Sequence, residues 1–453
     1  MTLAEIAAAS GARLIGADRA VTGVTTDSRR VHAGDLFVAL KGDRFDAHDF
    51  VPDVVARGAA AVMVAREIPD IGVPQLIVAD TRRGYGGLAR AWRARFTAPT
   101  LALTGSNGKT TVKEMLRAIL AAHTGEANAV HATEGNLNND VGVPQTMLAQ
   151  RAHHRFAIYE MGMNHLKEIE ALSRLVAPDV ALVIMAGTAH LGEVGSREAI
   201  AEAKGEIFAG LKPGGTAVIN LHDRFGAYWQ RVAQGHRQLT FGIAPGDDVC
   251  ATFRPDGLDI AHGGECMRVN LQVPGRHNQL NALAATAGAL ALGVPLATCA
   301  KALAQFAGVP GRLRRFTGHN AATILDDTYN ANPDSAKAAI DVLAALTPPR
   351  ILVMGDMGEL GADAPALHRE VGAYARRAGI DALYAIGEQS RGVAEAFGAD
   401  ALHFTDHATL AAALRARLGA GTNVRANVLV KGSRFMQMER VVAELVPHYA
   451  GHH

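Results

Sequence analysis

Short apolar runs separated by polar loops dominate the first hundred residues. Three of these runs have the length and composition of buried strands, and the loops between them contain Gly, Asp and Pro. They are Leu36–Leu40, Ala61–Val64 and Gln75–Val78. One helical stretch lies among them, and Met1–Ile6 has the pattern of a short amphipathic helix. The pattern predicts a small α/β domain, which we place at residues 1–97.

From Pro99 onward, apolar strands alternate with helical stretches. The predicted strands are Thr100–Leu103, Phe156–Tyr159, Val180–Met185 and Thr216–Ile219. Strands that alternate with helices favour a mostly parallel sheet. We therefore predict a second α/β domain at residues 98–311, which ends near Val309-Pro310-Gly311.

The last part of the chain shows the same alternation. The predicted strands are Thr323–Leu325, Ile351–Met354, Leu383–Ile386 and Val428–Val430. Helices are predicted to begin near Asp334, Pro365, Ser390 and His407. This βαβ rhythm indicates a third, Rossmann-like domain at residues 312–453. The predicted fold class is thus α/β with three domains.

Length and charge agree with this partition and narrow the class of partner. A chain of 453 residues has room for about three domains of ordinary size. Lys and Arg number 45 against 44 Asp and Glu, which leaves a net charge of +1. No global field therefore favours nucleic acid or an anionic membrane as a partner, and an anionic ligand has to be held locally.

The compartment is predicted from the cysteines and the apolar segments. Cys250, Cys266 and Cys299 are scattered, as a reducing compartment permits. The N-terminus lacks the basic start of a secretion signal. The apolar segment Ala282–Ala297 falls short of the roughly 20 residues that a membrane span needs. We expect a cytoplasmic protein without membrane insertion, and a monomer.

A glycine-bearing loop follows the strand Thr100–Leu103 and precedes a helical run. In this context glycines let backbone N–H groups surround a polyphosphate, a lysine neutralises the terminal phosphates, and a hydroxyl ligates Mg²⁺. Lys109 and Thr110 occupy these two positions. The pattern departs from the usual one at Leu103, where glycine is expected. The loop predicts nucleotide binding; a turn that only caps the helix is the alternative. Its residues are Gly105, Ser106, Asn107, Gly108, Lys109, Thr110 and Thr111.

Two residues after predicted strands are candidates for completing a magnesium site. Glu160 follows the apolar run Phe156–Tyr159, and His190 follows Val180–Met185. The carboxyl ends of parallel strands are where open α/β sheets bind ligands. Oxygen and imidazole ligands there suit Mg²⁺ beside phosphates. The alternatives are a capping or surface carboxylate and a structural histidine.

Lys204 lies on an apolar face of the predicted helix Glu198–Phe208. Its neighbours at helical spacing are apolar, and the glutamates of the helix form a separate stripe. A lysine buried without a partner loses its charge, because desolvation lowers its pKa. A neutral amine can react with CO₂ to give a carbamate, which behaves as a carboxylate. The alternative is a side chain that extends its head to solvent.

Taken together, these residues resemble the Mur ligases of peptidoglycan synthesis over nearly the whole chain. Members of that family have an N-terminal domain for the UDP end of the precursor, a central ATPase, and a C-terminal domain for the incoming amino compound. The resemblance implies that the loop binds ATP, and that Thr110, Glu160, His190 and a carbamylated Lys204 hold two Mg²⁺. It further implies contacts to adenine, phosphate and ribose from Asn281, Arg312 and Asp327, respectively.

Three segments are similar to the branch of this family that adds a dipeptide. They are Asp326–Pro333, Gly355–Gly361 and Lys431–Arg434. The resemblance implies UDP-N-acetylmuramoyl-tripeptide and D-Ala-D-Ala as substrates. It places substrate contacts at Ser28, Arg29 and Lys41 in the first domain, Asn138 and Asn139 in the second, and Tyr329, Asn330 and Asn332 in the third.

The implied reaction is ATP-dependent formation of an amide. The tripeptide carboxylate attacks the γ-phosphate to give an acyl phosphate, and the dipeptide amine then displaces phosphate. Lys109 and the two Mg²⁺ offset the repulsion between the two anions, with Glu160, His190 and Lys204 completing the catalytic set. Folylpolyglutamate synthase, which has a similar loop, is the alternative enzyme. A nucleotide-dependent switch is the alternative from another class.

Overall fold

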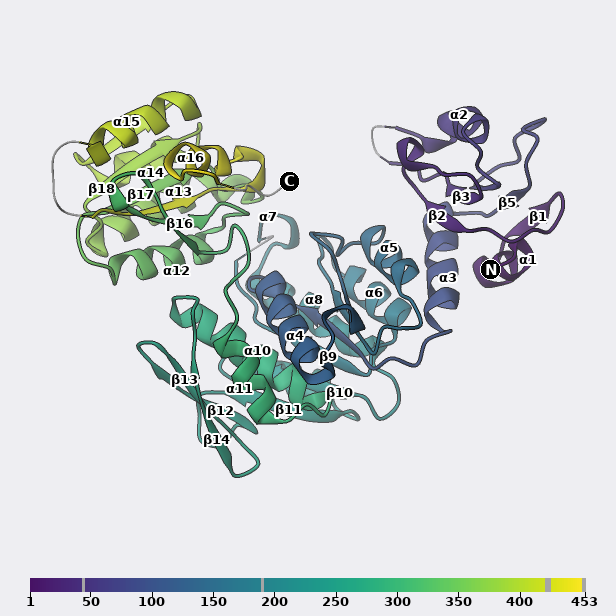
Figure 1. Cartoon of the computed structure of the whole chain (residues 1–453), viewed down its shortest axis with the longest axis horizontal. Coiled ribbons are helices and arrows are strands. Elements are labelled where there is room, and N and C mark those ends of the chain that lie inside the picture. Colours follow the sequence, from purple (N-terminus) through teal and green to yellow (C-terminus); the bar gives the residue numbers. More distant parts are fainter. Residues whose placement is uncertain (43–44, 189–190, 420–424, 450–453) are drawn as a thin grey trace.

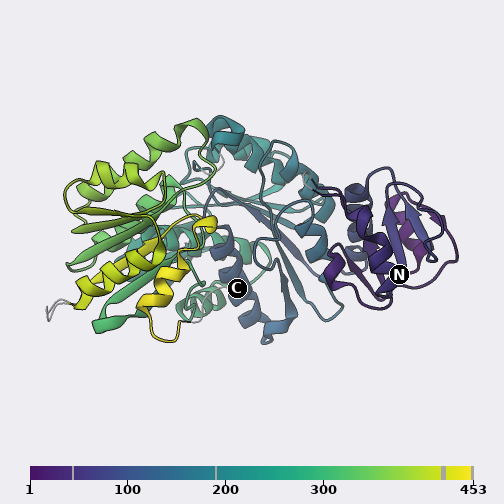
Figure 2. The same cartoon turned by 90° about the horizontal axis from the view of Figure 1, so that it is seen from above.

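Three α/β bodies follow one another along the chain in the computed structural model, each with its own sheet (Figure 1). The structure describes residues 1–42, 45–188, 191–419 and 425–449. Seen from above, the N-terminal body lies at one end and the C-terminal body at the other, with the central body between them (Figure 2). The predicted α/β class with three units is confirmed.

The N-terminal body is a five-stranded sheet in the order β1-β5-β4-β3-β2. Only β1 runs antiparallel to its neighbour. Thr2 caps α1 in a capping box with Glu5, which confirms the helix expected at the N-terminus. The strands are β1 (Arg13–Ile15), β2 (Gly23–Thr25), β3 (Asp35–Val38), β4 (Ala61–Val64) and β5 (Gln75–Ile77). The helices are α1 (Leu3–Ser10), η1 (Ser28–Arg30), η2 (Ala47–Phe50), α2 (Val51–Ala56) and α3 (Thr81–Arg93).

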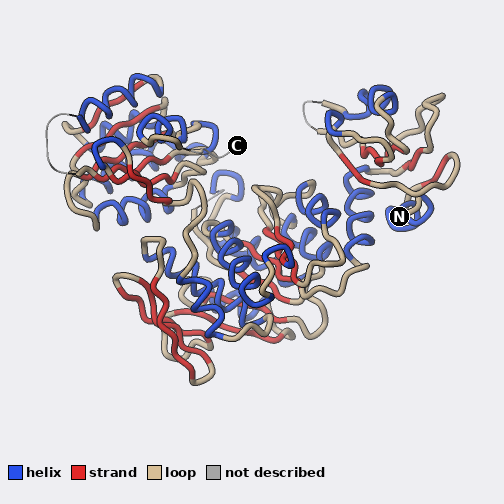
Figure 3. The backbone as a smooth tube through the Cα atoms, in the orientation of Figure 1, coloured by secondary structure: helices blue, strands red, loops and turns tan. Residues whose placement is uncertain are grey.

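The central body has a nine-stranded sheet in the order β14-β13-β12-β11-β10-β9-β6-β8-β7. Strands β6 to β12 pair in parallel, and β12, β13 and β14 form an antiparallel meander at one edge (Figure 3). The predicted mostly parallel sheet is confirmed; the meander was not predicted. The strands are β6 (Thr100–Thr104), β7 (Val130–Ala132), β8 (Phe156–Glu160), β9 (Val180–Val183), β10 (Thr216–Asn220), β11 (Arg237–Gly242), β12 (Val249–Arg254), β13 (Gly257–His262) and β14 (Glu265–Asn270).

Helices cover both faces of this sheet, so the inner strands β6, β8 and β9 are buried throughout. Along β6, Leu101 and Leu103 face one apolar cluster with α4 and α10, whereas Ala102 faces a second cluster with α6 and α8. The helices are α4 (Lys109–Thr124), η3 (Ala127–Ala129), α5 (Gly142–Ala149), α6 (Glu168–Val176), α7 (Leu191–Val194), α8 (Arg197–Gly205), η4 (Glu206–Gly210), α9 (Gly226–Val232), α10 (Arg276–Ala291) and α11 (Leu296–Ala304).

The C-terminal body is a six-stranded sheet in the order β15-β16-β20-β17-β18-β19, parallel except for β15. Helices lie on both faces over separate cores, as in a Rossmann-like fold. The strands are β15 (Arg314–Thr317), β16 (Thr323–Asp327), β17 (Arg350–Gly355), β18 (Ala382–Ile386), β19 (Ala401–Phe404) and β20 (Asn427–Lys431). The helices are η5 (His319–Ala321), α12 (Pro333–Ala344), η6 (Gly361–Asp363), α13 (Ala364–Arg377), α14 (Ser390–Phe397), α15 (His407–Gly419), η7 (Arg434–Met436) and α16 (Glu439–Leu445).

The three sheets occupy separate stretches of sequence. Their strands span residues 13–77, 100–270 and 314–431. The boundaries expected after residues 97 and 311 stay predictions; both positions lie between the strands of successive sheets. Within the described residues, no helix combines the length and apolar character needed to cross a bilayer.

Candidate functional site

The glycine-bearing loop of residues 105–111, called the phosphate loop from here on, leads from β6 into the start of α4. It lies at the carboxyl edge of the central sheet. The Ser106 N–H donates to the Met185 carbonyl at 3.0 Å, which fixes the loop to the segment that leaves β9. Gly108 has a φ of 82°, and a Cβ atom on it would lie 2.3 Å from Asn281 Oδ1. A larger residue is strained in this conformation and has no room. The loop thus depends on close backbone approaches, as a phosphate cradle does.

Leu103, the departure from the usual loop pattern, is a buried strand residue. It pairs with Glu160 of β8 on one side and Leu182 of β9 on the other. The position that usually holds the first glycine is therefore still inside the sheet here. The loop is compact because β6 continues to Thr104.

Lys109 is the first residue of α4, and its ammonium lies near charged side chains of both the central and the C-terminal body. Its Nζ donates to the Gly105 carbonyl at 2.7 Å. Burial lowers the pKa of this amine, the Glu160 carboxylate raises it, and the Arg312 guanidinium lowers it. An ammonium bonded to a carbonyl can turn to a phosphate oxygen, which is a stronger acceptor. The structure thus brings Lys109, Glu160 and Arg312 together, as expected for a site that binds polyphosphate.

Glu160 is buried at the end of β8 and has one carboxylate oxygen that is not engaged. Oε1 accepts from Asn138 Nδ2 at 2.8 Å, and the Glu160 N–H donates to Thr133 Oγ1 at 3.0 Å. Oε2 is buried, and no described residue forms a hydrogen bond with it. A buried oxygen without a partner is costly unless another ligand compensates it. This arrangement fits a carboxylate that ligates a divalent cation.

The amine of Lys204 is also buried without a hydrogen-bond partner among the described residues. The residue is 0% exposed, so the alternative that its head extends to solvent is wrong. Burial holds the pKa of Lys204 well below its ordinary value, and the nearby Lys109 ammonium lowers it further. The prediction of an inward, partnerless lysine is confirmed. The helix around it is shorter than predicted, because the chain changes to the 3₁₀ helix η4 at Glu206.

The remaining expected magnesium ligands are only partly described. Thr110 is half-buried in the first turn of α4, beside Lys109. His190 lies outside the described residues, so its placement stays a prediction. No group of three or more His, Cys, Asp or Glu side chains that could hold a metal occurs in the described part of the chain. Glu160 is the described side chain whose free oxygen suits a cation at the loop.

The three residues expected around the nucleoside have partners of their own. Asn281 Nδ2 donates to Asn278 at 3.2 Å while its Oδ1 faces Gly108. The Arg312 guanidinium carbon lies 4.1 Å from the centre of the Tyr329 ring. Asp327 accepts from Lys431 Nζ at 2.5 Å, in a buried ion pair. Contacts of Asn281, Arg312 and Asp327 with a nucleotide stay predictions.

The C-terminal body contacts the phosphate loop directly. Asn332 Nδ2 donates to Asn107 Oδ1 at 2.8 Å, and Asn332 also caps α12. Asp334, the second residue of α12, accepts from both the N–H and the hydroxyl of Thr188, at 2.7 and 2.8 Å. The expected dipeptide-binding body is thus connected to both loops that follow β6 and β9. Asn330, which is also expected to contact the substrate, is exposed.

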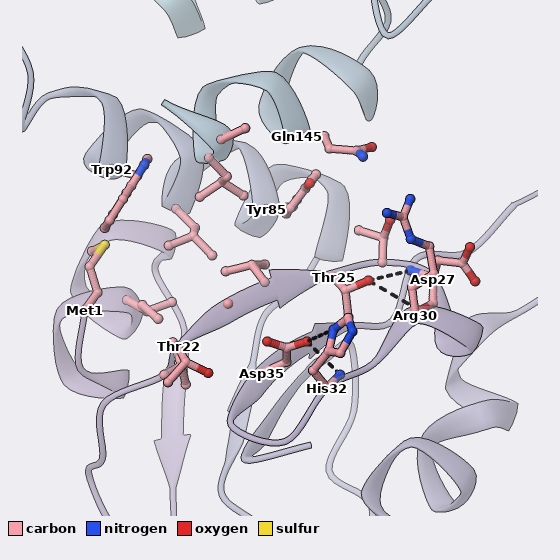
Figure 4. A pocket seen from close by; sticks show the side chains of 18 of the residues that line it. Met1, Thr22, Thr25, Asp27, Arg30, His32, Asp35, Tyr85, Trp92 and Gln145 are labelled. Atoms are coloured by element: carbon pink, nitrogen blue, oxygen red, sulfur yellow. Dashed lines mark hydrogen bonds and ion pairs between the residues drawn. The ribbon is translucent and has the colours of Figure 1, made fainter. Parts of the chain in front are cut away.

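A cavity of about 710 Å³ lies where the N-terminal body meets α5 (Figure 4). Its wall combines polar loop residues after β2 with apolar residues of α1, α3 and α5. Asp27 and Arg30 line it, whereas the expected residues Ser28, Arg29 and Lys41 do not. Arg29 is an exposed side chain that pairs with Asp27 at 2.8 Å. A cavity of this size and mixed lining suits a nucleotide-sized ligand.

The loop that contains Asn138 and Asn139 connects this cavity with the phosphate loop. Leu137 lines the cavity, and the next residue, Asn138, bonds to the Glu160 carboxylate. Asn139 Oδ1 accepts from the Gly142 N–H at 2.8 Å, at the start of α5. The structure thus places this loop between the two sites, while its contacts to substrate stay predictions.

Two residues of this region escaped prediction from sequence. Lys113 is 1% exposed and bonds to the Thr133 carbonyl. Asp334 was identified only as the start of a helix, although it bonds to Thr188. The signal for Lys113 was present, because it lies one turn after Lys109 between the apolar residues Val112 and Leu116. Nothing local to Asp334 indicated a partner 146 residues away.

Comparison with known families gives matches along most of the chain. Residues 103–289 match the Mur ligase middle domain, and residues 311–434 match the glutamate ligase domain of Mur ligases. Residues 20–92 match the catalytic domain of the Mur ligase family. The UDP-N-acetylmuramoyl-tripeptide–D-alanyl-D-alanine ligase of Escherichia coli is 42% identical, covering 98% of each chain.

Solved structures give the same result at the level of fold. MurF from Acinetobacter baumannii superposes with a TM-score of 0.90 at 37% identity and covers 97% of each chain. The MurF ligase from Thermotoga maritima, in complex with ADP, has a TM-score of 0.81 at 27% identity, covering 94% of this chain and 97% of its own. Folylpolyglutamate synthase from Mycobacterium tuberculosis shares the fold at 18% identity and a TM-score of 0.62, covering 79% of this chain and 92% of its own.

Proposed function

This chain belongs to the Mur ligase family, and from that premise we propose that it joins D-alanyl-D-alanine to UDP-N-acetylmuramoyl-tripeptide with hydrolysis of ATP. The relative that is 42% identical over nearly the full length bears the name of this activity. The observation in the molecule that supports it best is the grouping of Lys109, the free oxygen of Glu160 and the buried Lys204 amine. This grouping lies between a nucleotide-sized cavity and the C-terminal body.

The first step brings together two anions, the tripeptide carboxylate and the γ-phosphate. Thr110, Glu160, His190 and Lys204 are the residues that would hold two Mg²⁺, and the ions would supply positive charge at the phosphates when bound. Lys109 moves from the Gly105 carbonyl to the terminal phosphate and neutralises part of its charge. A carboxylate oxygen bonds to phosphorus as the bond to ADP breaks, which gives an acyl phosphate.

The second step needs the dipeptide amine beside the acyl carbon. Asn332 and Asp334 keep α12 against the loops of the central body, so the C-terminal body faces the phosphate site. Tyr329, Asn330 and Asn332 are the proposed contacts of the dipeptide. The neutral amine attacks the carbonyl carbon, phosphate leaves with the electron pair of its bond to carbon, and the nitrogen loses a proton.

Binding of the tripeptide precursor is assigned to the N-terminal cavity and the loop beyond it. Ser28, Arg29 and Lys41 are the proposed contacts of the UDP end, and Asn138 and Asn139 those of the muramoyl-peptide. Asn281, Arg312 and Asp327 are the proposed contacts of adenine, phosphate and ribose. Alanine substitutions should raise the KM of the assigned substrate and leave the KM of the other two substrates within about twofold.

Lys204 is proposed to carry a carbamate. Its unprotonated Nζ bonds to the carbon of CO₂, one C–O π pair moves to oxygen, and the nitrogen releases a proton. The product is an anion that suits the magnesium site, and burial of the amine favours the unprotonated form that reacts. Lys204→Ala should lose ligation and regain part of it with a short-chain carboxylic acid. Full activity of the wild type in CO₂-free buffer would exclude the carbamate.

The ligase is distinguished from its alternatives by phosphate release. We expect release to require both the tripeptide precursor and D-alanyl-D-alanine, whereas a folylpolyglutamate synthase requires a folate and glutamate. A nucleotide switch releases phosphate without either substrate. The proposal also includes a monomer in the cytoplasm; the three cysteines are free thiols, as that compartment permits. Light scattering of the purified chain tests the monomer.

A further inference from the structure

Helix α4 carries two lysines one turn apart, and only the first is explained by phosphate binding. Lys109 faces the loop, whereas Lys113 is 1% exposed within the central body. Its neighbours in sequence, Val112 and Glu114, lie in the core and near the surface, respectively. Lysine is rarely buried to this extent unless it is paired.

The Lys113 ammonium has two partners. It donates to the Thr133 carbonyl at 2.5 Å and lies 3.2 Å from Glu114 Oε1. Glu114 also pairs with Arg117 at 2.7 Å, so its charge is shared. Removing an ammonium from water is costly, and methionine would fill a similar volume without that cost. Packing alone therefore does not account for a lysine here.

Thr133, the partner of Lys113, is bonded to the strand that ends in Glu160. Its N–H donates to the Ile158 carbonyl at 3.0 Å, and its Oγ1 accepts from the Glu160 N–H at 3.0 Å. Thr133 is 1% exposed, so water does not compete for these bonds. A continuous set of hydrogen bonds thus connects α4 with the backbone of Glu160.

The segment that Thr133 begins returns to the same strand end. Asn138 donates from Nδ2 to Glu160 Oε1 at 2.8 Å, and its carbonyl accepts from the Gly162 N–H at 2.8 Å. The two ends of the segment 133–138 are therefore bonded to Glu160, Thr133 to its backbone and Asn138 to its carboxylate. Lys113 holds the first residue of this segment to the helix that starts at the phosphate loop.

We infer that Lys113 is a positioning residue that fixes residues 133–138, and through them the Glu160 carboxylate, relative to the Lys109 ammonium. One side chain thereby couples the helix at the nucleotide site to the loop assigned to the muramoyl-peptide. The inference rests on the proposed function for the role of Glu160 as a magnesium ligand. The hydrogen-bonded connection itself does not depend on that role.

Hydrogen–deuterium exchange of the full chain tests the connection without any substrate. In Lys113→Met, the amides of residues 133–138 are expected to exchange at least about fivefold faster, while those of α6 stay unchanged. Arg117→Met is the matched control, because it removes a cation from the same helix at a side chain that is 50% exposed. Wild-type exchange in residues 133–138 of Lys113→Met would overturn the inference, whether or not the chain is a ligase.

Kinetics test the consequence for the site. Lys113→Met is expected to raise the Mg²⁺ concentration for half-maximal phosphate release, and the KM of the tripeptide precursor, at least about fivefold each. The affinity for nucleotide should change less than about twofold, since the loop and Lys109 are retained. A lysine with a purely structural role would lower the thermal midpoint and the active fraction but leave both constants unchanged, which would overturn the inference.

A second variant keeps the test decisive if Lys113→Met does not fold. Thr133→Val removes the acceptor of the Glu160 N–H and leaves the carbonyl that Lys113 contacts. It is expected to raise the same two constants. Where both variants fold, their combination should be no worse than the more severe one, because both interrupt one connection. Unchanged constants in Thr133→Val, or effects that simply add, would contradict the inference.

Discussion

Replacing Lys204 by methionine should stabilise the central body and abolish ligation. The lysine is 0% exposed, and its amine forms no hydrogen bond with any described residue. Burial and the Lys109 ammonium both lower its pKa. Methionine has a similar length and no polar atom at that position. The substitution therefore removes a desolvation cost together with a group that the reaction needs.

The size of the effect is limited by the lowered pKa of this amine. In the unfolded chain the pKa is near 10.5, so a lowered pKa in the folded chain costs at most about 5 kcal/mol at pH 7. The Glu206 carboxylate raises this pKa and so limits the cost, and we expect a gain of about 2–4 kcal/mol in Lys204→Met.

The same proton sets the sign of the pH dependence. Because the pKa of Lys204 is depressed in the fold, the unfolded chain binds the additional proton at every pH between the folded value and 10.5. The contribution of Lys204 to the free energy of unfolding therefore rises with pH, by up to about 3 kcal/mol from pH 7 to pH 9. Lys204→Met lacks this rise.

Tryptophan fluorescence can report unfolding next to Lys204. The chain has two tryptophans, and Trp229 is buried with its indole N–H bonded to the Ala201 carbonyl of α8 at 2.8 Å. In a Trp92→Phe background it is the only one. Guanidinium titrations of this background with and without Lys204→Met are carried out at pH 7 and pH 9 in CO₂-free buffer. They give the gain in the free energy of unfolding at pH 7 and the change in that free energy between the two pH values. Loss of stability at pH 7, an unchanged pH dependence, or retained ligation would each refute the reasoning.

Three further substitutions test the phosphate loop, the contact between the central and C-terminal bodies, and His154, whose ring packs against those of His131 and His153. Gly108→Ala should weaken nucleotide binding at least about tenfold in a titration, because φ is 82° and the new Cβ meets Asn281; a wild-type affinity would show that the loop has room. Asp334→Ala removes both hydrogen bonds from Thr188, which connect the C-terminal body to the central body. The substitution should therefore raise the KM of the dipeptide about tenfold and enlarge the radius of gyration measured by X-ray scattering. Burial lowers the pKa of His154 to about 4, so the unfolded chain binds more protons between pH 4 and 6.5 and stability falls as the pH drops through that range. His154→Gln should remove about 1 kcal/mol of this fall in urea titrations, since solvent screens a partly exposed group.

The parts of the fold that sequence predicted are those with a strong local pattern. Strands such as β6, β8 and β9 are continuous apolar runs because helices cover both faces of the sheet. The meander β12 to β14 was missed because its residues are mostly half-buried or exposed, so no continuous apolar run marks it. Lys204 was found for the same reason as the strands: its helix face is apolar.

The contacts between distant segments left no local pattern to detect. Asn332 has the sequence signature of a helix cap and is one, yet the same side chain donates to Asn107, 225 residues earlier. Lys113 beside Glu114 resembles an ordinary surface pair on a helix, although it is buried. Such roles depend on which loops the sheet order brings together, and spacing along the chain does not encode that order.

Transfer of an oxygen isotope tests the central claim that ATP activates the tripeptide carboxylate. The tripeptide precursor is labelled with ¹⁸O in the carboxylate that forms the new amide, and the chain is supplied with Mg²⁺, ATP and D-alanyl-D-alanine. An acyl phosphate delivers one labelled oxygen to each inorganic phosphate, and the product should be the pentapeptide precursor. Phosphate without label, or label in AMP, would contradict activation by the γ-phosphate.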